Sequence, residues 1–258
     1  MQYLQIFLAF SLWLAVGVVP VAPARAQALE RAGTPDICAS APEFSVPDKK
    51  LENLAAAVAG HDAIEVLAVG SGTTVGQDGG GGKAFPHRMI EALRAALPGR
   101  EIDLTLRGAR GVTAAEMLVL INEEMAEKPF ALVLWQTGTV EAVRAIPPEE
   151  LQQTLATGIE RIRAKKADLV LIDAQYTRAM AAKVNEAPYL QVLRQAANAP
   201  GVVLFARYDL MRSWALEGRN DLENIRKADR ENAVDALHAC LADVLVRFVS
   251  HGAGIPIR

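Results

Sequence analysis

The chain has 258 residues, of which 51% are apolar and 22% charged, a composition typical of a globular protein with one large core. Its 19 Gly and 13 Pro are ordinary usage, so a disordered or collagen-like chain is excluded. With a net charge of −3, two Cys and four scattered His, the sequence predicts no nucleic-acid partner, no metal site and no cofactor.

Residues 1–26 have the pattern of a secretory signal peptide. An apolar run extends from Tyr3 to Ala22, and Ala24-Arg25-Ala26 is the small-x-small pattern of a cleavage site. The alternative is an uncleaved anchor helix, because about 20 apolar residues can span a bilayer. We expect cleavage after Ala26 and a periplasmic or secreted protein, which touches the membrane only if this segment is retained.

Beyond the signal segment, the sequence predicts an N-terminal segment with a first helix (27–60), a main domain (61–250) and a C-terminal tail (251–258). Five short runs of aliphatic and β-branched residues in the main domain are typical of strands that are buried on both faces. In chain order they are Ile64–Val69, Ile102–Leu106, Ala131–Trp135, Leu169–Ile172 and Val202–Phe205.

Helical patterns lie between and after these runs. Thr113-Ala-Ala-Glu116 is a capping box that begins one helix, Pro147-Pro148 opens a second, and Ala233–Val249 supplies the last. Such alternation predicts β-α-β units, and therefore one α/β domain in which helices cover both faces of a parallel sheet.

Any chemistry is expected beyond the carboxyl ends of the strands, where open parallel sheets bind their ligands. The first strand leads into a glycine-rich stretch that ends at Lys83. A phosphate-binding loop would need Gly at position 77 and Ser or Thr at position 84, but the chain has Gln77 and Ala84. Nucleotide binding is therefore not expected.

The segments that follow the first three strands carry a family resemblance. They read Gly70-Ser71-Gly72-Thr73-Thr74, Arg107-Gly108-Ala109-Arg110-Gly111 and Trp135-Gln136-Thr137-Gly138-Thr139. In this order, and with the stretch from Phe205 to Trp214, they resemble the SGNH hydrolases (GDSL-like esterases), in particular a secreted bacterial branch. The resemblance covers about Cys38 to Phe248. It implies a flavodoxin-like three-layer α/β/α sandwich with a five-stranded sheet.

The resemblance also implies a catalytic set, from which this chain departs. Members of the family hydrolyse esters with a Ser nucleophile, a Gly N–H and an Asn as oxyanion donors, and a final D-x-x-H. Here the nucleophile position is Gly72 and the oxyanion Asn position is Val140, whereas Gly111 is retained. The D-x-x-H aligns with Asp229 and Asn232, and an Asn accepts no proton near neutral pH.

A second alignment of the last motif stays open. Asp235-Ala236-Leu237-His238 spells D-x-x-H literally, and Ser71 stands one place before the nucleophile position. A shifted site of Ser71, Asp235 and His238 is therefore conceivable. Against it, His238 falls inside the last helical pattern, where a His is usually a packed or surface residue, and the Ser71 hydroxyl has a simpler role in bonding the backbone.

Four other residues gain an interpretation from the resemblance or from their position. Cys38 and Cys240 match Cys positions of the family branch, which implies a disulfide between the N-terminal segment and the last helix; two unpaired thiols are the alternative. Arg107 and Arg110 flank the retained glycine and suit an anion, although a solvated loop is the more common explanation for such residues.

Three functional hypotheses follow. The preferred one is an exported, non-catalytic binding or accessory protein that keeps the family's cleft, with an acylated saccharide or lipid ligand or an envelope protein as partner. The alternative is an active carboxylic-ester hydrolase that uses the shifted site. A purely structural envelope protein is the third, and it predicts a filled cleft.

Overall fold

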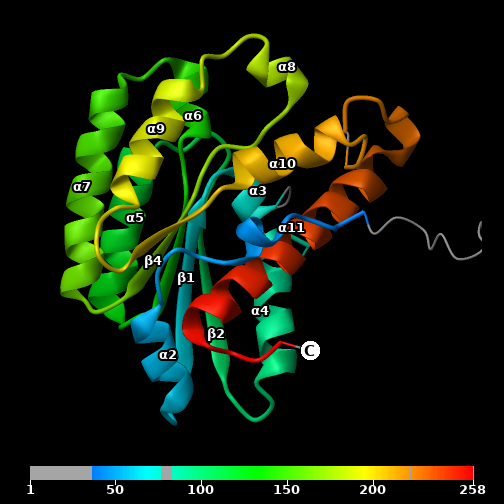
Figure 1. The fold of residues 1–258 in the computed structure, drawn as a ribbon. Helices are drawn as coiled ribbons and strands as arrows, with labels where there is room; N and C mark the ends of the chain where they lie inside the picture. The colour runs from blue at the N-terminus through cyan, green and yellow to red at the C-terminus, as the bar shows by residue number, and fades with distance from the viewer. Residues whose placement is uncertain (1–36, 77–82, 221, 258) are drawn as a thin grey trace, which may run out of the picture. The chain divides into compact units, whose positions relative to one another are not determined.

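A computed structural model describes residues 37–76, 83–220 and 222–257 (Figure 1). The predicted signal peptide lies outside the described residues. All five predicted strands are present, and they form one parallel sheet in the order β2-β1-β3-β4-β5, which is the flavodoxin-like order. Their bounds are β1 Ile64–Gly70, β2 Ile102–Gly108, β3 Leu132–Gln136, β4 Asp168–Ile172 and β5 Val202–Phe205. The predicted α/β fold is confirmed.

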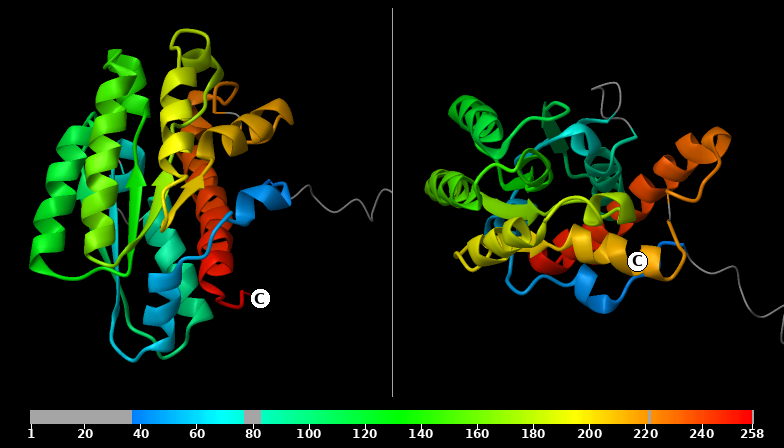
Figure 2. Two further views of the ribbon diagram at one scale, coloured as in Figure 1. Left: turned by 60° about the vertical axis from the view of Figure 1, so that its left-hand side comes forward. Right: turned by 90° about the horizontal axis from the view of Figure 1, so that it is seen from above.

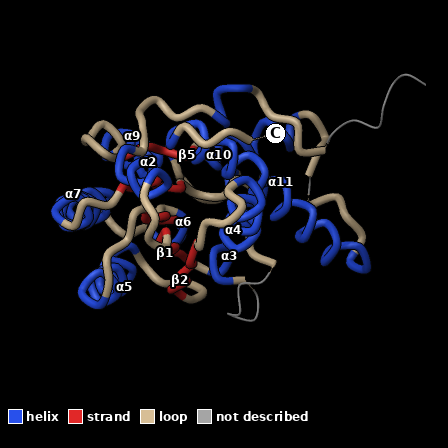
Figure 3. Tube along the Cα trace, turned by 90° about the horizontal axis from the view of Figure 1, so that it is seen from below, coloured by secondary structure: helices blue, strands red, loops and turns tan. Residues whose placement is uncertain are grey.

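Helices cover both faces of the sheet and make the sandwich of three layers. On one face lie α5 (Ala114–Glu127), α7 (Pro148–Ala164) and α9 (Ala187–Ala196), and on the other α2 (Glu52–Ala59), α4 (Phe85–Ala96) and α11 (Arg230–Ala253) (Figure 2). Figure 3 looks along the sheet, with the strands between the two helical layers. No helix of the described residues is both long and apolar enough to cross a membrane.

Both faces of the sheet are buried because successive strand residues point to opposite sides and are apolar on both. Along β1, Val66 and Ala68 join the core under α4 and α11, whereas Leu67 and Val69 join the core under α5 and α7. This explains why β1, β3, β4 and β5 read as nearly continuous apolar runs, whereas the partly buried edge strand β2 alternates apolar and polar residues.

Shorter elements connect the main ones, and several of them lie at the carboxyl ends of the strands. They are η1 (Pro42–Ser45), α3 (Gly72–Val75), α6 (Thr139–Arg144), α8 (Arg178–Ala181), α10 (Arg207–Leu216) and η2 (Lys227–Asp229). Among them, α3 directly follows β1, and α6 and α10 follow β3 and β5, at the carboxyl ends of these strands.

The helix starts agree with the sequence, but the last helix is longer than its pattern. The capping box at Thr113 is present, with Glu116 bonded back to the Thr113 N–H. Helix α11 begins at Arg230 rather than Ala233 and ends at Ala253 rather than Val249, so it includes the start of the expected tail. It continues because Gly252 fits tightly against Leu51, and Gly254 then adopts the left-handed cap conformation.

The implied disulfide between Cys38 and Cys240 is confirmed, and it joins the segment before η1 to the middle of α11. Next to it, the Trp214 indole N–H donates to the Ala39 carbonyl at 2.8 Å. Cys240 and Trp214 are fully buried, so this end of the chain is fixed to the core under α11.

The tightest approach of a helix to the sheet occurs at Gly158 of α7. A Cβ built at this glycine would lie 2.4 Å from Cζ3 of Trp135, whose ring fills the space between β3 and the helix. We expect Gly158→Ala to lower the free energy of unfolding by about 1–2 kcal/mol, because overpacking outweighs the better helix propensity of Ala. Urea unfolding measures this. Thr157→Ala, on the exposed face of the same helix, is the control, and a Gly158→Ala protein as stable as wild type would contradict the packing argument.

Candidate functional site

Two glycines let the loops after β1 and β2 fold over the end of the sheet. Gly70 and Gly108 are paired in register at the carboxyl ends of these strands. A Cβ at Gly108 would lie 1.9 Å from the Gly70 carbonyl oxygen, and its φ of 130° disfavours any side chain. A Cβ at Gly70 would lie 2.2 Å from Oγ1 of Thr74. The strand ends can therefore meet closely, and the turn that follows packs directly on them.

One buried amide holds this turn. Oε1 of Gln136, the last residue of β3, accepts hydrogen bonds from the Ser71 N–H at 3.2 Å and from the hydroxyls of Ser71, Thr73 and Thr74 at 3.2, 3.3 and 2.9 Å. Gln136 is only 1% exposed. The Ser71 hydroxyl thus donates to an amide oxygen, which does not take a proton near neutral pH.

The nucleophile position of the family is an open glycine. Gly72 begins α3, and the nearest described atoms to a Cβ added there belong to Arg110, whose Cβ would lie at 3.7 Å, an ordinary van der Waals contact. The backbone at Gly72 does not have the positive φ that favours glycine. Neither the backbone nor the packing explains the missing side chain, so the position would accommodate a Ser.

His238 lies at the same edge but in an arrangement that differs from that of a catalytic base. Its Nδ1 accepts a hydrogen bond from the Phe85 N–H at 3.1 Å, so the neutral ring carries its proton on Nε2. Burial, together with the positive charges of Arg207 and Arg88, lowers the pKa of His238 to about 4. In a Ser-His-Asp triad the Asp accepts from Nδ1 and leaves Nε2 free to take the Ser proton. The tautomer here is the opposite one.

The carboxylate of the shifted site does not complete such a triad. Asp235 pairs with Arg88, with Oδ1 and Nη2 2.5 Å apart. Within the described part of the chain, no hydrogen bond joins Asp235 to His238 or His238 to Ser71. Ser71 and His238 are brought to one edge, but they are not connected as nucleophile and base.

The other alignment places its residues outside the cleft. Asp229 ends η2 and pairs with Arg226, with Oδ2 and Nη2 2.7 Å apart, and Asn232 is exposed in the first turn of α11. Val140 is half-buried in α6, and its neighbour Thr139 lies at the cleft in its place. Of the family positions, only Gly72 and Gly111 border the cleft.

An open cleft of about 900 Å³ lies at this edge of the sheet, so the filled cleft of a purely structural protein is not found. Its described walls come from the turn after β1, the loop after β2, the segments after β3 to β5, and α11. The lining residues are Ser71, Gly72, Thr73, Val75, Gly76, Gly108, Ala109, Arg110, Gly111, Thr139, Gln175, Arg207, Val234 and His238.

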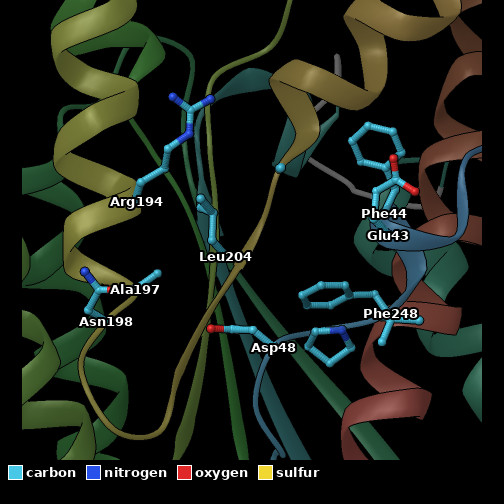
Figure 4. Close-up of a pocket in the computed structure, with 11 residues that line it drawn as sticks. Glu43, Phe44, Asp48, Arg194, Ala197, Asn198, Leu204 and Phe248 are labelled. Carbon is cyan, nitrogen blue, oxygen red and sulfur yellow. The ribbon is translucent and has the colours of Figure 1, made fainter.

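A smaller hollow of about 260 Å³ lies elsewhere and shares no residue with the cleft. Arg194 and Asn198 border it from the side of α9, and Glu43, Phe44 and Phe248 from the opposite side (Figure 4). It contains none of the predicted site residues, so we place the candidate site in the larger cleft.

Two buried ionisable residues were missed from the sequence: Arg207, which lines the cleft, and Asp173, whose carbonyl accepts from Arg207. Arg207, the first residue of α10, is 1% exposed; its Nε donates to the Asp173 carbonyl and its Nη1 to the Thr73 hydroxyl, each at 3.1 Å. Burial raises the pKa of Asp173 to about 7, although the Tyr208 N–H donates to its Oδ1 at 2.8 Å. Burial also lowers the pKa of Arg207 to about 10. The signal was available: Asp173 directly follows one predicted strand, and Arg207 stands two residues after the end of the next.

The sheet order and the cleft at the strand ends define the fold of the SGNH (GDSL-like) hydrolases. Residues 37–255 match the Non-GDSL lipase-like family, and the chain belongs to this family. The predicted resemblance is thus confirmed for the fold. Among curated proteins, none matches the chain in sequence.

Solved structures share this fold at low identity. TesA matches with 21% identity and a TM-score of 0.55, over 70% of this chain and 95% of TesA. A catalytic mutant of Axe2, an acetylxylan esterase from Geobacillus stearothermophilus, matches with 15% identity and a TM-score of 0.59, over 77% of this chain and 100% of Axe2. The two-domain esterase CEX, active on acetylated mannans, matches with 15% identity and a TM-score of 0.62, over 81% of this chain and 56% of CEX.

Proposed function

We propose that this protein is an exported, non-catalytic member of the SGNH-hydrolase fold that binds its ligand in the cleft at the strand ends. The observation that carries the proposal is the absence, in the described residues, of a connected nucleophile and base. The Ser71 hydroxyl is bonded to Gln136, and Nδ1 of His238 is occupied by the Phe85 N–H. The cleft itself is open and large enough for a disaccharide-sized ligand.

The ligand class follows from the shared fold by analogy alone. Axe2 and CEX are named as esterases of acetylated xylan and acetylated mannans. We therefore assign this cleft an acylated saccharide or a related acyl ligand, with an accessory role beside another envelope protein. Export is supported by the signal-peptide pattern and agrees with the disulfide, because disulfides persist outside the cytoplasm.

A second candidate is ester hydrolysis by Ser71 with His238. It is favoured by one observation, that both side chains border the same cleft. For this reaction Ser71 would have to leave Gln136, and His238 would have to release the Phe85 N–H and move its proton to Nδ1. These rearrangements make it the less supported function.

Hydrolysis of p-nitrophenyl acetate by the purified protein separates the two functions. We expect wild type, Ser71→Ala and His238→Ala to have the same rate within about twofold, since a site without a working triad retains at most about 10³–10⁴-fold catalysis over water. Gly72→Ser should fold normally and remain as slow, because the position has space for a side chain but no base serves it. A turnover that falls by about a hundredfold or more in both Ala variants would establish the second candidate.

A further inference from the structure

Arg207 is a buried cation that forms no ion pair with an acidic side chain of the described residues. It is 1% exposed, and the partners of its Nε and Nη1 are a neutral carbonyl and a neutral hydroxyl. Its Nη2 is buried, and among the described residues it has no hydrogen-bond partner and no carboxylate forms an ion pair with Arg207. Isolated buried charges are rare because desolvation is unfavourable, so an unpaired one indicates a missing water, ion or ligand.

The nearest acid does not supply the missing charge. The carbonyl oxygen of Asp173 accepts from Arg207, whereas its carboxyl Oδ1 accepts from the Tyr208 N–H and Oδ2 has no partner in the part of the chain that the structure describes. Because burial raises the pKa of Asp173 to about 7, this carboxyl carries only part of a charge near neutral pH. The attraction of Asp173 partly offsets the effect of burial on the pKa of Arg207, so part of the positive charge of the guanidinium stays uncompensated near neutral pH.

The surroundings of Arg207 in the cleft are suited to an anion. The lining includes two arginines, Arg207 and the exposed Arg110, and no Asp or Glu among the described residues. His238 is neutral, and the hydrogen bond to its Nδ1 leaves the Nε2 proton as a further donor. The chain as a whole has a net charge of −3, so this positive lining is a local feature of the cleft.

We propose that the cleft holds a ligand with a carboxylate group, which binds beside Arg207 with the guanidinium as its counter-ion. A single uncompensated charge matches a monoanion, and a carboxylate is a planar acceptor that suits guanidinium N–H groups. Sugar acids and fatty acids both carry this group. The inference rests on the proposed function, since it names the ligand class of the same cleft.

Thermal unfolding at constant ionic strength tests the proposal, with anions and their neutral amides as matched probes. We expect glucuronate or butyrate at about 10 mM to raise Tm by several degrees, and glucuronamide and butyramide to leave it unchanged. A larger shift with glucuronate identifies a sugar acid, and a larger shift with butyrate a fatty acid. An equal shift with sulfate and inorganic phosphate would mean an adventitious anion only and would overturn the proposal.

Three variants assign the effect to the cleft. Arg207→Gln should weaken glucuronate or butyrate binding at least about tenfold and Arg110→Gln about threefold, measured by isothermal titration. Arg194→Gln, an exposed arginine of α9 paired with Asp209, should leave binding unchanged. Should Arg207→Gln not fold, titration of the wild-type protein decides: equal affinity for glucuronate and glucuronamide, and for butyrate and butyramide, would overturn the proposal.

Different experimental results would contradict this inference and the proposed function. A protein that binds a neutral acetylated saccharide but does not distinguish glucuronate from glucuronamide is a binding protein without the carboxylate site. Ester turnover that depends on Ser71 would instead overturn the proposed function, whatever the anion results.

Discussion

Replacing Cys38 and Cys240 together by Ala is expected to lower the free energy of unfolding by about 5 kcal/mol. The two cysteines are 202 residues apart in sequence, so the bond restricts nearly the whole unfolded chain. In the chain-entropy model, closing a loop of this length stabilises the native state by about 5 kcal/mol, and removal of native disulfides from small secreted domains costs about 2–5 kcal/mol. Urea unfolding of the variant and of wild type measures the difference.

Ala is the appropriate replacement because Cys240 is fully buried, and a Ser hydroxyl there would need a hydrogen-bond partner. Wild type with a reducing agent provides the matching experiment without substitution, and it should lose about the same stability. Equal stability of the oxidised and reduced proteins would contradict the prediction. Loss of the disulfide would also affect the candidate site directly, because His238 lies two residues from Cys240 on the helix that the disulfide fixes.

The fold could be predicted because its sheet is buried on both faces. Strands of this kind read as short apolar runs, and the capping box at Thr113 and the prolines at Pro147 and Pro148 mark helix starts directly. The end of α11 could not be predicted in the same way, because a glycine near the end of a helical pattern usually marks the end of the helix. At Gly252 it instead allows a close contact with Leu51, which is distant in sequence.

The candidate site could be predicted only in part. The loss of the nucleophile could be predicted from the sequence, because Gly72 stands at that position and glycine has no side chain. The path of α11 decides which residues of the last motif reach the cleft, and its early start at Arg230 leaves Asn232 exposed and brings His238 to the lining. The tautomer of His238 depends on the N–H of Phe85, a contact over 153 residues that no local pattern encodes.

Gln136 and Arg207 illustrate two kinds of missed residue. Gln136 ends β3, and nothing in the sequence indicates that its single amide oxygen holds the whole turn after β1. Arg207 was accessible to reasoning, because a charged residue two positions after the end of a buried strand lies where ligands bind in parallel sheets. Its lack of a counter-ion, which carries the inference about the ligand, is visible only in three dimensions.

Asp173→Asn is expected to stabilise the protein at pH 8 and to have little effect near pH 4. Burial raises the pKa of Asp173 from an ordinary value of 3.8 to about 7, so between these values the native state holds a proton that the unfolded state has lost. The free energy of unfolding of wild type therefore falls as pH rises through this window, by about 4 kcal/mol at most, and no further above it. Asn carries no charge at any of these pH values, so the variant does not lose this stability as the pH rises.

The difference between variant and wild type is the quantity to measure, by urea unfolding at several pH values. His238, whose pKa is lowered to about 4, contributes the opposite slope below its ordinary value of 6.5, so the two effects offset each other in the bare wild-type curve. Asp243→Asn, at an exposed α11 residue paired with Arg247, is the control, with an expected effect below about 1 kcal/mol. An Asp173→Asn protein less stable than wild type at pH 8 would mean that the Asp173 carboxylate stays ionised as the counter-ion of Arg207. The cleft would then have no uncompensated buried charge to offer a ligand.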